Sequence, residues 1–162
     1  MEVKDKVVIV TGGANGIGEA LCRRFVADGA KAVVVADIEF AKAKQVAEEI
    51  GATAMRLDVR DEQNMIDVVN ATEEQFGPVD LFCGNAGILM IDAQHVATSD
   101  NEDWQTIWEV NVMAHVNAAR ALLPRMIKRG SGYFLITASA AGLLSQVGSA
   151  TYSVTKHAAV AF

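Results

Sequence analysis

The residues Thr11-Gly12-Gly13-Ala14-Asn15-Gly16-Ile17-Gly18 follow the apolar run Val7-Val8-Ile9-Val10 and precede a stretch of helical periodicity from Ile17 to Asp28. This order predicts a buried strand, a tight turn and then a helix. Glycines let the backbone approach a pyrophosphate closely, and the unpaired N–H groups of the helix N-terminus stabilise its charge. Glycine turns are also common as purely structural loops, but the position between strand and helix predicts a dinucleotide site. The expected cofactor-binding residues of this turn are Gly12, Asn15, Gly16, Ile17 and Gly18.

Short β-branched runs alternate with longer helical stretches along the rest of the chain. Strands are predicted at 7–10, 31–37, 52–59, 79–83 and 133–137. Helices are predicted at 17–28, 39–50, 61–76 (with Asp61 as N-cap), 103–128 and from 151 onward. Alternation of this kind, with continuously apolar strands, predicts an α/β fold: a doubly wound, Rossmann-like parallel sheet covered on both faces. Because no repeat or linker is visible, residues 1–162 are expected to form a single dinucleotide-binding domain.

The C-terminal side of this fold is expected to be incomplete. The sequence stops at Val160-Ala161-Phe162, inside an apolar helical pattern that shows no stop signal. The predicted strand at 133–137 would also be an unprotected sheet edge. These two features predict that the chain is a fragment of a longer protein.

Composition excludes several classes of protein. With 51% apolar and 21% charged residues, the 162-residue chain is neither disordered nor of low complexity. Its formal net charge of -6, without a basic cluster, argues against nucleic acid or an anionic membrane face as partner. We expect two buried free thiols, no metal site among three scattered histidines, and a cytoplasmic location, because no targeting segment or long apolar run is visible. The cysteines are Cys22 and Cys83, and the histidines His95, His115 and His157.

Asp37 ends the second predicted strand, 19 residues after Gly18. A carboxylate at this position can accept hydrogen bonds from the ribose hydroxyls of an adenosine. It would repel a 2′-phosphate by about 4 kcal/mol at a separation of about 4 Å. Because Asn15 occupies the place in the turn where a basic residue could offset this repulsion, Asp37 and the following Ile38 predict NAD in preference to NADP.

Tyr152 and Lys156 are four residues apart at the start of a predicted helix and so share one face. A tyrosine can act as a base only if its pKa is lowered toward neutrality, which requires about 4 kcal/mol, and a neighbouring ammonium supplies such an effect. Alone, this spacing is usually a solvated helix face. Here Ser139 follows a predicted strand, and Asn111 interrupts an apolar helical stretch, so the four residues together form a candidate catalytic set.

With these elements in order, the sequence resembles the short-chain dehydrogenase/reductase family from about Lys6 to Phe162. The resemblance rests on the glycine-rich turn, Asp58, the triplet Asn85-Ala86-Gly87, and the set Asn111, Ser139, Tyr152 and Lys156. Gly84 departs from the family pattern, because many relatives have Asn there. The family also continues beyond residue 162 with further strands and a substrate loop.

The resemblance implies a role for each matching residue. Tyr152 would exchange a proton with the substrate oxygen, and Lys156 would lower the pKa of the tyrosine and bind the nicotinamide ribose. Ser139 would bind the substrate oxygen, and Asn111 would hold a water of the proton relay. The implied cofactor contacts beyond the turn and Asp37 are Asp58 and Val59 at the adenine, and Asn85, Ala86 and Gly87 beside the cofactor.

Two functions remain open from the sequence. The first is an oxidoreductase that transfers hydride between NAD and a small secondary alcohol or ketone, and the second is a non-catalytic NAD-binding or interaction module. Apolar residues after Ser139, namely Leu143, Leu144 and Val147, predict an apolar pocket wall and a hydrophobic substrate. The stretch Val110–Met126 is apolar on several faces, which predicts a homo-oligomer that packs through this helix. Trp104 and Trp108 are expected to pack as a core or interface pair.

Overall fold

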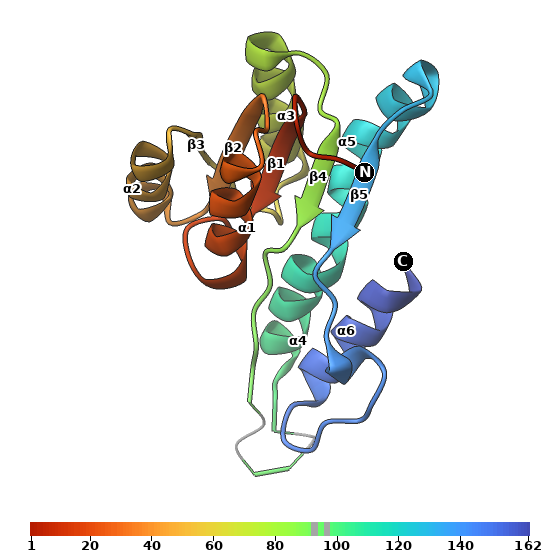
Figure 1. The fold of residues 1–162 in the computed structure, drawn as a ribbon. Helices are drawn as coiled ribbons and strands as arrows, with labels where there is room; N and C mark the ends of the chain where they lie inside the picture. Colours follow the sequence, from red (N-terminus) through yellow and green to blue (C-terminus); the bar gives the residue numbers. More distant parts are fainter. Residues whose placement is uncertain (92–93, 96–97) are drawn as a thin grey trace.

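A parallel five-stranded sheet forms the centre of the computed structural model, which describes residues 1–91, 94–95 and 98–162 (Figure 1). The strands are β1 (Val7–Thr11), β2 (Ala32–Asp37), β3 (Thr53–Arg56), β4 (Leu81–Gly84) and β5 (Tyr133–Ile136). Their order in the sheet is β3-β2-β1-β4-β5, and the register places Thr11 beside Ala36 and Cys83 beside Leu135. The predicted doubly wound α/β sheet is therefore confirmed, although β3 is shorter than the predicted strand at 52–59.

Helices cover both faces of the sheet and bury two separate apolar layers (Figure 1). The helices are α1 (Gly16–Ala27), α2 (Phe40–Ile50), α3 (Glu62–Phe76), α4 (Asn101–Trp108), α5 (Ala114–Arg129) and α6 (Ala150–Ala161). Successive residues of β1 point to opposite faces, so Val8 and Val10 pack against α1 and α2, while Val7 and Ile9 pack against α3 and α5. This explains why the strands are apolar throughout.

Local signals set the ends of several helices. Asp61 caps α3 as predicted, because its side chain accepts a hydrogen bond from the N–H of Asn64 at 3.1 Å. Gly51 and Gly130 end α2 and α5 in the left-handed conformation, with φ of 69° and 68°. The sequence signals at these positions were therefore sufficient to place the boundaries.

The predicted single helix at 103–128 is wrong in one respect, because it is divided into α4 and α5 by a π-helical turn, η1 (Glu109–Met113). Asn111 lies in this turn and is fully buried. Ile107 is the buried apolar residue of α4, whereas Trp104 is half-buried and Trp108 exposed. The expectation that the two tryptophans form a core pair is therefore wrong, and the alternative that they form an interface pair stays a prediction.

The topology places the carboxyl ends of the strands at one edge of the sheet, where α4 and α6 lie (Figure 1). The direction of strand succession reverses between β1 and β4, and the crevice at such a reversal is where doubly wound sheets bind ligands. Among the helices of the described residues, none is long and apolar enough to cross a membrane.

Candidate functional site

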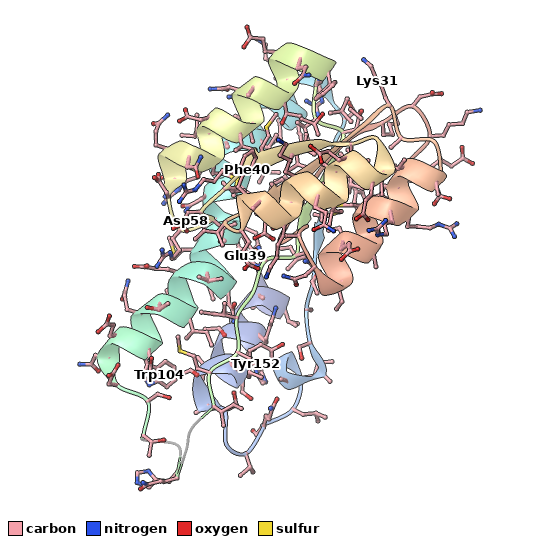
Figure 2. All side chains as sticks on the ribbon, turned by 90° about the vertical axis from the view of Figure 1, so that its left-hand side faces the viewer. Lys31, Glu39, Phe40, Asp58, Trp104 and Tyr152 are labelled. Carbon is pink, nitrogen blue, oxygen red and sulfur yellow. The ribbon has the colours of Figure 1, made fainter. Side chains whose placement is uncertain are left out.

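A cavity of about 750 Å³ lies at the carboxyl ends of the strands. At one end it is lined by Asp37, Ile38, Asp58 and Val59, and at the other by Ser139, Tyr152 and Lys156. Gly12, Asn15, Ile17, Asn85, Ala86 and Gly87 line the part between them. In Figure 2, Glu39 and Asp58 lie beside the helices that cover the sheet, and Tyr152 lies lower in the view, on α6. The structure thus brings most of the predicted site residues to one cavity.

Three predicted residues, Gly16, Gly18 and Asn111, are not among the residues that line this cavity. Gly18 has a packing role instead, because a Cβ there would lie 1.9 Å from the carbonyl oxygen of Gly12. Gly12 has a φ of 65°, and a Cβ on it would lie 2.9 Å from Cα of Ala86. The absence of side chains at Gly12 and Gly18 lets α1 begin directly against the turn and beside the end of β4.

Thr11 and Asn85 bind the turn to the end of β4. The Thr11 hydroxyl accepts hydrogen bonds from the N–H groups of Asn85 and Ala86, at 3.0 and 3.1 Å, and donates to the carbonyl of Cys83. In return, Nδ2 of Asn85 donates to the carbonyls of Thr11 and Gly12. Thr11 was not predicted as a site residue, although it opens the quoted glycine motif and ends a strand.

Asp37 is buried, and both of its carboxylate oxygens accept backbone hydrogen bonds. Oδ2 accepts from the N–H of Ala14 at 3.0 Å, and Oδ1 accepts from the N–H of Glu39 at 2.9 Å. The carboxylate therefore connects the glycine-rich turn with the end of β2 and still borders the cavity. A fixed negative charge at this position favours neutral hydroxyls and disfavours a phosphate.

Asp58 pairs with Arg60 at the same end of the cavity. The guanidinium of Arg60 binds the Asp58 carboxylate at 2.7 Å and holds its pKa below the usual value. Arg60 also lines the cavity, and sequence reasoning did not single it out. Its position two residues after Asp58, in the turn that follows β3, is the signal that could have identified it.

Lys156 is buried beside Tyr152 on α6, with Nζ 5.7 Å from the centre of the tyrosine ring. Burial lowers the pKa of this lysine, since the charged form loses hydration. Nζ donates a hydrogen bond of 2.9 Å to the carbonyl of Thr137, just beyond β5. Tyr152 and Lys156 thus lie on one face of α6, and the hydrogen bond to Thr137 holds the ammonium of Lys156 in place.

Ser139 caps a short 3₁₀-helix, η2 (Ala140–Gly142), by accepting a hydrogen bond from the N–H of Ala141 at 3.1 Å. This segment packs tightly on α6, because a Cβ at Gly142 would lie 2.5 Å from the carbonyl oxygen of Lys156. The close approach of glycine backbone to helix brings Ser139 to the cavity that Tyr152 and Lys156 also line.

The Asn111 side chain fixes the backbone that follows β4. Its Oδ1 accepts from the N–H of Ile88, and its Nδ2 donates to the carbonyl of Ile88, both at 2.9 Å. Nδ2 also donates to the hydroxyl of Thr155 on α6 at 3.1 Å. Both amide protons are therefore used by the protein, and the water-holding role of Asn111 stays a prediction.

The apolar wall expected after Ser139 is wrong as a wall of this cavity. Leu143, Leu144 and Val147 are exposed and are not among the residues that line it. Its apolar lining includes Ile88 and Leu89, after β4, and Val110, in the π-helical turn. Among the described residues, no group of three or more His, Cys, Asp or Glu side chains could hold a metal ion.

Comparison with known proteins agrees with this geometry. The model of the short chain dehydrogenase family matches residues 6–162. The chain is 36% identical over 167 residues to 1-deoxy-11-beta-hydroxypentalenate dehydrogenase of Streptomyces exfoliatus, covering 99% of this chain and 60% of that protein. It is 39% identical over 139 residues to (-)-isopiperitenol/(-)-carveol dehydrogenase, mitochondrial, of Mentha piperita, covering 83% of this chain and 52% of that protein.

Among solved structures, a short chain dehydrogenase/reductase from Burkholderia phymatum in complex with NAD superposes with a TM-score of 0.94. It is 29% identical and is matched over 99% of this chain and 58% of its own length. The chain thus spans about 60% of the length of the proteins that head these comparisons.

Proposed function

Because the chain belongs to the short chain dehydrogenase family, we propose that the protein is an NAD-dependent oxidoreductase that interconverts a secondary alcohol and a ketone. The observation that carries the proposal is the single cavity lined by Asp37 at one end and by Ser139, Tyr152 and Lys156 at the other. A site that only binds a nucleotide does not require the hydroxyls of Ser139 and Tyr152 beside the buried ammonium of Lys156.

The residues that line the cavity suit the chemical groups of NAD. The turn offers backbone without a side chain at Gly12, which lines the cavity, and the N-terminus of α1 offers a positive dipole end to a pyrophosphate. Asp37 would accept the adenosine ribose hydroxyls, with Ile38, Asp58 and Val59 around the adenine. Asn85, Ala86 and Gly87 would lie beside the nicotinamide half, for which Tyr152 and Lys156 are the polar partners. When bound, NAD supplies the hydride acceptor at its nicotinamide ring.

Tyr152 would take the proton of the alcohol or return it to the ketone. The buried ammonium of Lys156, 5.7 Å from the tyrosine ring centre, stabilises negative charge on the phenol oxygen when the proton leaves. Ser139 would orient the substrate oxygen by hydrogen bonding. Burial of Lys156 strengthens these interactions, since the low local dielectric screens them less than water does.

The substrate is proposed to be a hydrophobic secondary alcohol. Ile88, Leu89 and Val110 supply apolar surface in the cavity that Ser139 and Tyr152 also line. Similar proteins are named for hydroxypentalenate and for isopiperitenol and carveol, which are alcohols on largely hydrocarbon skeletons. Apolar surface in a pocket favours ligands of this kind.

The first experiment is titration with NADH and NADPH, followed by cofactor fluorescence, on the wild type and two Asp37 variants. NADH is expected to bind more tightly than NADPH, and Asp37→Ala is expected to weaken NADH binding by about tenfold or more, because a charged hydrogen-bond acceptor is lost. Asp37→Asn keeps one acceptor but removes the charge, so it should chiefly improve NADPH binding.

A second measurement separates the two functions. The wild type is expected to reduce NAD with hydrophobic secondary alcohols, and Tyr152→Phe should lose this activity while it retains NADH binding. NADH binding without turnover by any alcohol would favour the non-catalytic NAD-binding module. Failure of both cofactors to bind would refute the cofactor assignment.

A further inference from the structure

Thr137 is the first residue after β5, and all three of its polar groups are engaged. Its N–H donates to the carbonyl of Gly84 at 3.1 Å, which extends the pairing of β5 with β4. Its hydroxyl donates to Oδ1 of Asn85 at 2.9 Å. Its carbonyl accepts the hydrogen bond from Nζ of Lys156, also at 2.9 Å. One residue thus contacts both the end of β4 and the proposed catalytic lysine.

The contact with Asn85 continues to the glycine-rich turn. Nδ2 of Asn85 donates to the carbonyls of Thr11 and Gly12, at 3.1 and 3.3 Å. A continuous series of hydrogen bonds therefore runs from Gly12 through Asn85 and Thr137 to Lys156, across the ends of β1, β4 and β5. Both ends of the series, Gly12 and Lys156, line the cavity.

The position of the Lys156 ammonium depends on where the Thr137 carbonyl points. Nζ carries three protons, and within the described part of the chain the acceptor assigned to it is this carbonyl. The two other hydrogen bonds of Thr137, from its N–H and its hydroxyl, hold its Cα against the end of β4 and so restrict the direction of its carbonyl. Loss of the hydroxyl would leave Oδ1 of Asn85 without this partner and free the Thr137 peptide to reorient.

We propose that Thr137 is a positioning residue, which holds the Lys156 ammonium toward the cavity and couples it to the glycine-rich turn. The inference rests on the proposed function, because it concerns the geometry of the same site. It assigns Thr137 a role through Lys156 rather than any contact with substrate.

The test compares Thr137→Val, which keeps the shape but removes the hydroxyl, with Thr137→Ser, which restores it. In the full-length enzyme, Thr137→Val is expected to lower kcat by about fivefold, the effect of one lost hydrogen bond. The dependence of kcat/KM on pH should also change, because a displaced ammonium stabilises less the negative charge that develops when the substrate proton leaves. Thr137→Ser should restore both values to within about twofold of the wild type.

Thr72→Val is the matched control, because Thr72 is a buried threonine whose hydroxyl donates to the carbonyl of Val68 inside α3, away from the cavity. It should lower the Tm and leave kcat and the pH profile unchanged. If Thr137→Val does not fold, Thr137→Ala, which removes both the hydroxyl and the methyl group, takes its place.

A readout without cofactor distinguishes failure of the inference from failure of the proposed function. In the cofactor-free protein, the Lys156 ammonium is followed by NMR titration. The pH midpoint of the Lys156 titration should fall in Thr137→Val and recover in Thr137→Ser. The carbonyl of Thr137 stabilises the charged form of Lys156, and this contact weakens when the hydroxyl no longer holds Thr137 in place. An unchanged midpoint together with a wild-type pH profile would overturn the inference, even if the Tm falls. Absence of turnover in the wild type, with the midpoint shift intact, would instead overturn the proposed function alone.

Discussion

His115 is a buried imidazole on α5 that lies against the end of β4. A Cβ at Gly84 would lie 2.8 Å from its Nδ1, so glycine at this position makes room for the ring. This gives a physical reason for the departure at Gly84 from the pattern of the family. Within the described residues, Nε2 of His115 has no hydrogen-bond partner. Burial, together with the smaller effect of the nearby Lys156 charge, lowers its pKa to about 4.

We expect His115 to make the protein less stable in acid. The unfolded chain binds a proton to this imidazole below a pKa near 6.5, whereas the folded protein does so only near 4. The neutral His115 imidazole therefore contributes fully to the free energy of unfolding above about pH 6.5, and this contribution is lost as the pH falls toward 4. Between about pH 7.5 and pH 5 the loss is about 2 kcal/mol in the free energy of unfolding.

Urea unfolding of the wild type and His115→Leu at these two pH values measures this contribution. The pH-dependent loss should shrink by about 2 kcal/mol in His115→Leu. His157→Gln is the control, because His157 is exposed on α6 and should leave the loss unchanged. An equal pH dependence in the wild type and His115→Leu would show that the imidazole is not held neutral by the fold.

At the scale of elements, the π-helical turn η1 determines how α4 and α5 meet the loop after β4. It places Asn111 where its side chain reaches both Ile88 and Thr155, so one residue joins the β4 loop to α6. Glycine at position 87 is part of this arrangement, because a Cβ there would lie 3.3 Å from Oδ1 of Asn111 and 3.5 Å from Nζ of Lys156. Irregular helical turns of this kind are frequent at functional sites.

Asn111→Ala is expected to lower the free energy of unfolding by about 2–3 kcal/mol, because it removes three hydrogen bonds from a buried position. The amide of Ile88 should also exchange with solvent faster, since it loses its acceptor. Urea unfolding and hydrogen exchange measured by NMR test the two effects. Asn117→Ala on α5 provides a comparison, because its contacts with the carbonyls of Val59 and Arg60 are longer, at 3.4 Å. Unchanged exchange at Ile88 would contradict the role assigned to Asn111.

At the scale of the whole molecule, the strand and helix order and the position of the cavity could be predicted from sequence, because they rest on local signals. The apolar run before Thr11, the cap at Asp61 and the glycines at helix ends each act within a few residues. The π-helical turn could not be predicted, because one extra residue in a helical turn hardly changes an apolar pattern. The bond from Thr137 to Asn85 joins residues 52 positions apart, and no local signal specifies such a pairing.

Local sequence signals also do not specify which surfaces join two copies of the chain. In the stretch Val110–Met126, predicted to be apolar on several faces, Val116 is half-buried and Leu123 is exposed on α5, and Ile127 just beyond it is also exposed. Leu123 lies seven positions after Val116 and four before Ile127, spacings that place the three on one helix face, away from Ala118 and Leu122, which pack against the sheet. An apolar stripe on a helix that already buries its other face is typical of an interface. We therefore keep the proposal of a homo-oligomer that packs through α5.

Leu123→Glu is expected to weaken self-association by about a hundredfold, because it would place an unpaired charge in the interface between two copies of α5. Sedimentation of the full-length protein over a range of concentrations measures the shift toward monomer. Phe40→Glu is the matched control: Phe40 on α2 is 42% exposed, close to the 41% of Leu123, but lies on the opposite side of the sheet (Figure 2). Association lost equally in both variants would point to a general effect of charge, and a wild type that remains monomeric would refute the α5 interface.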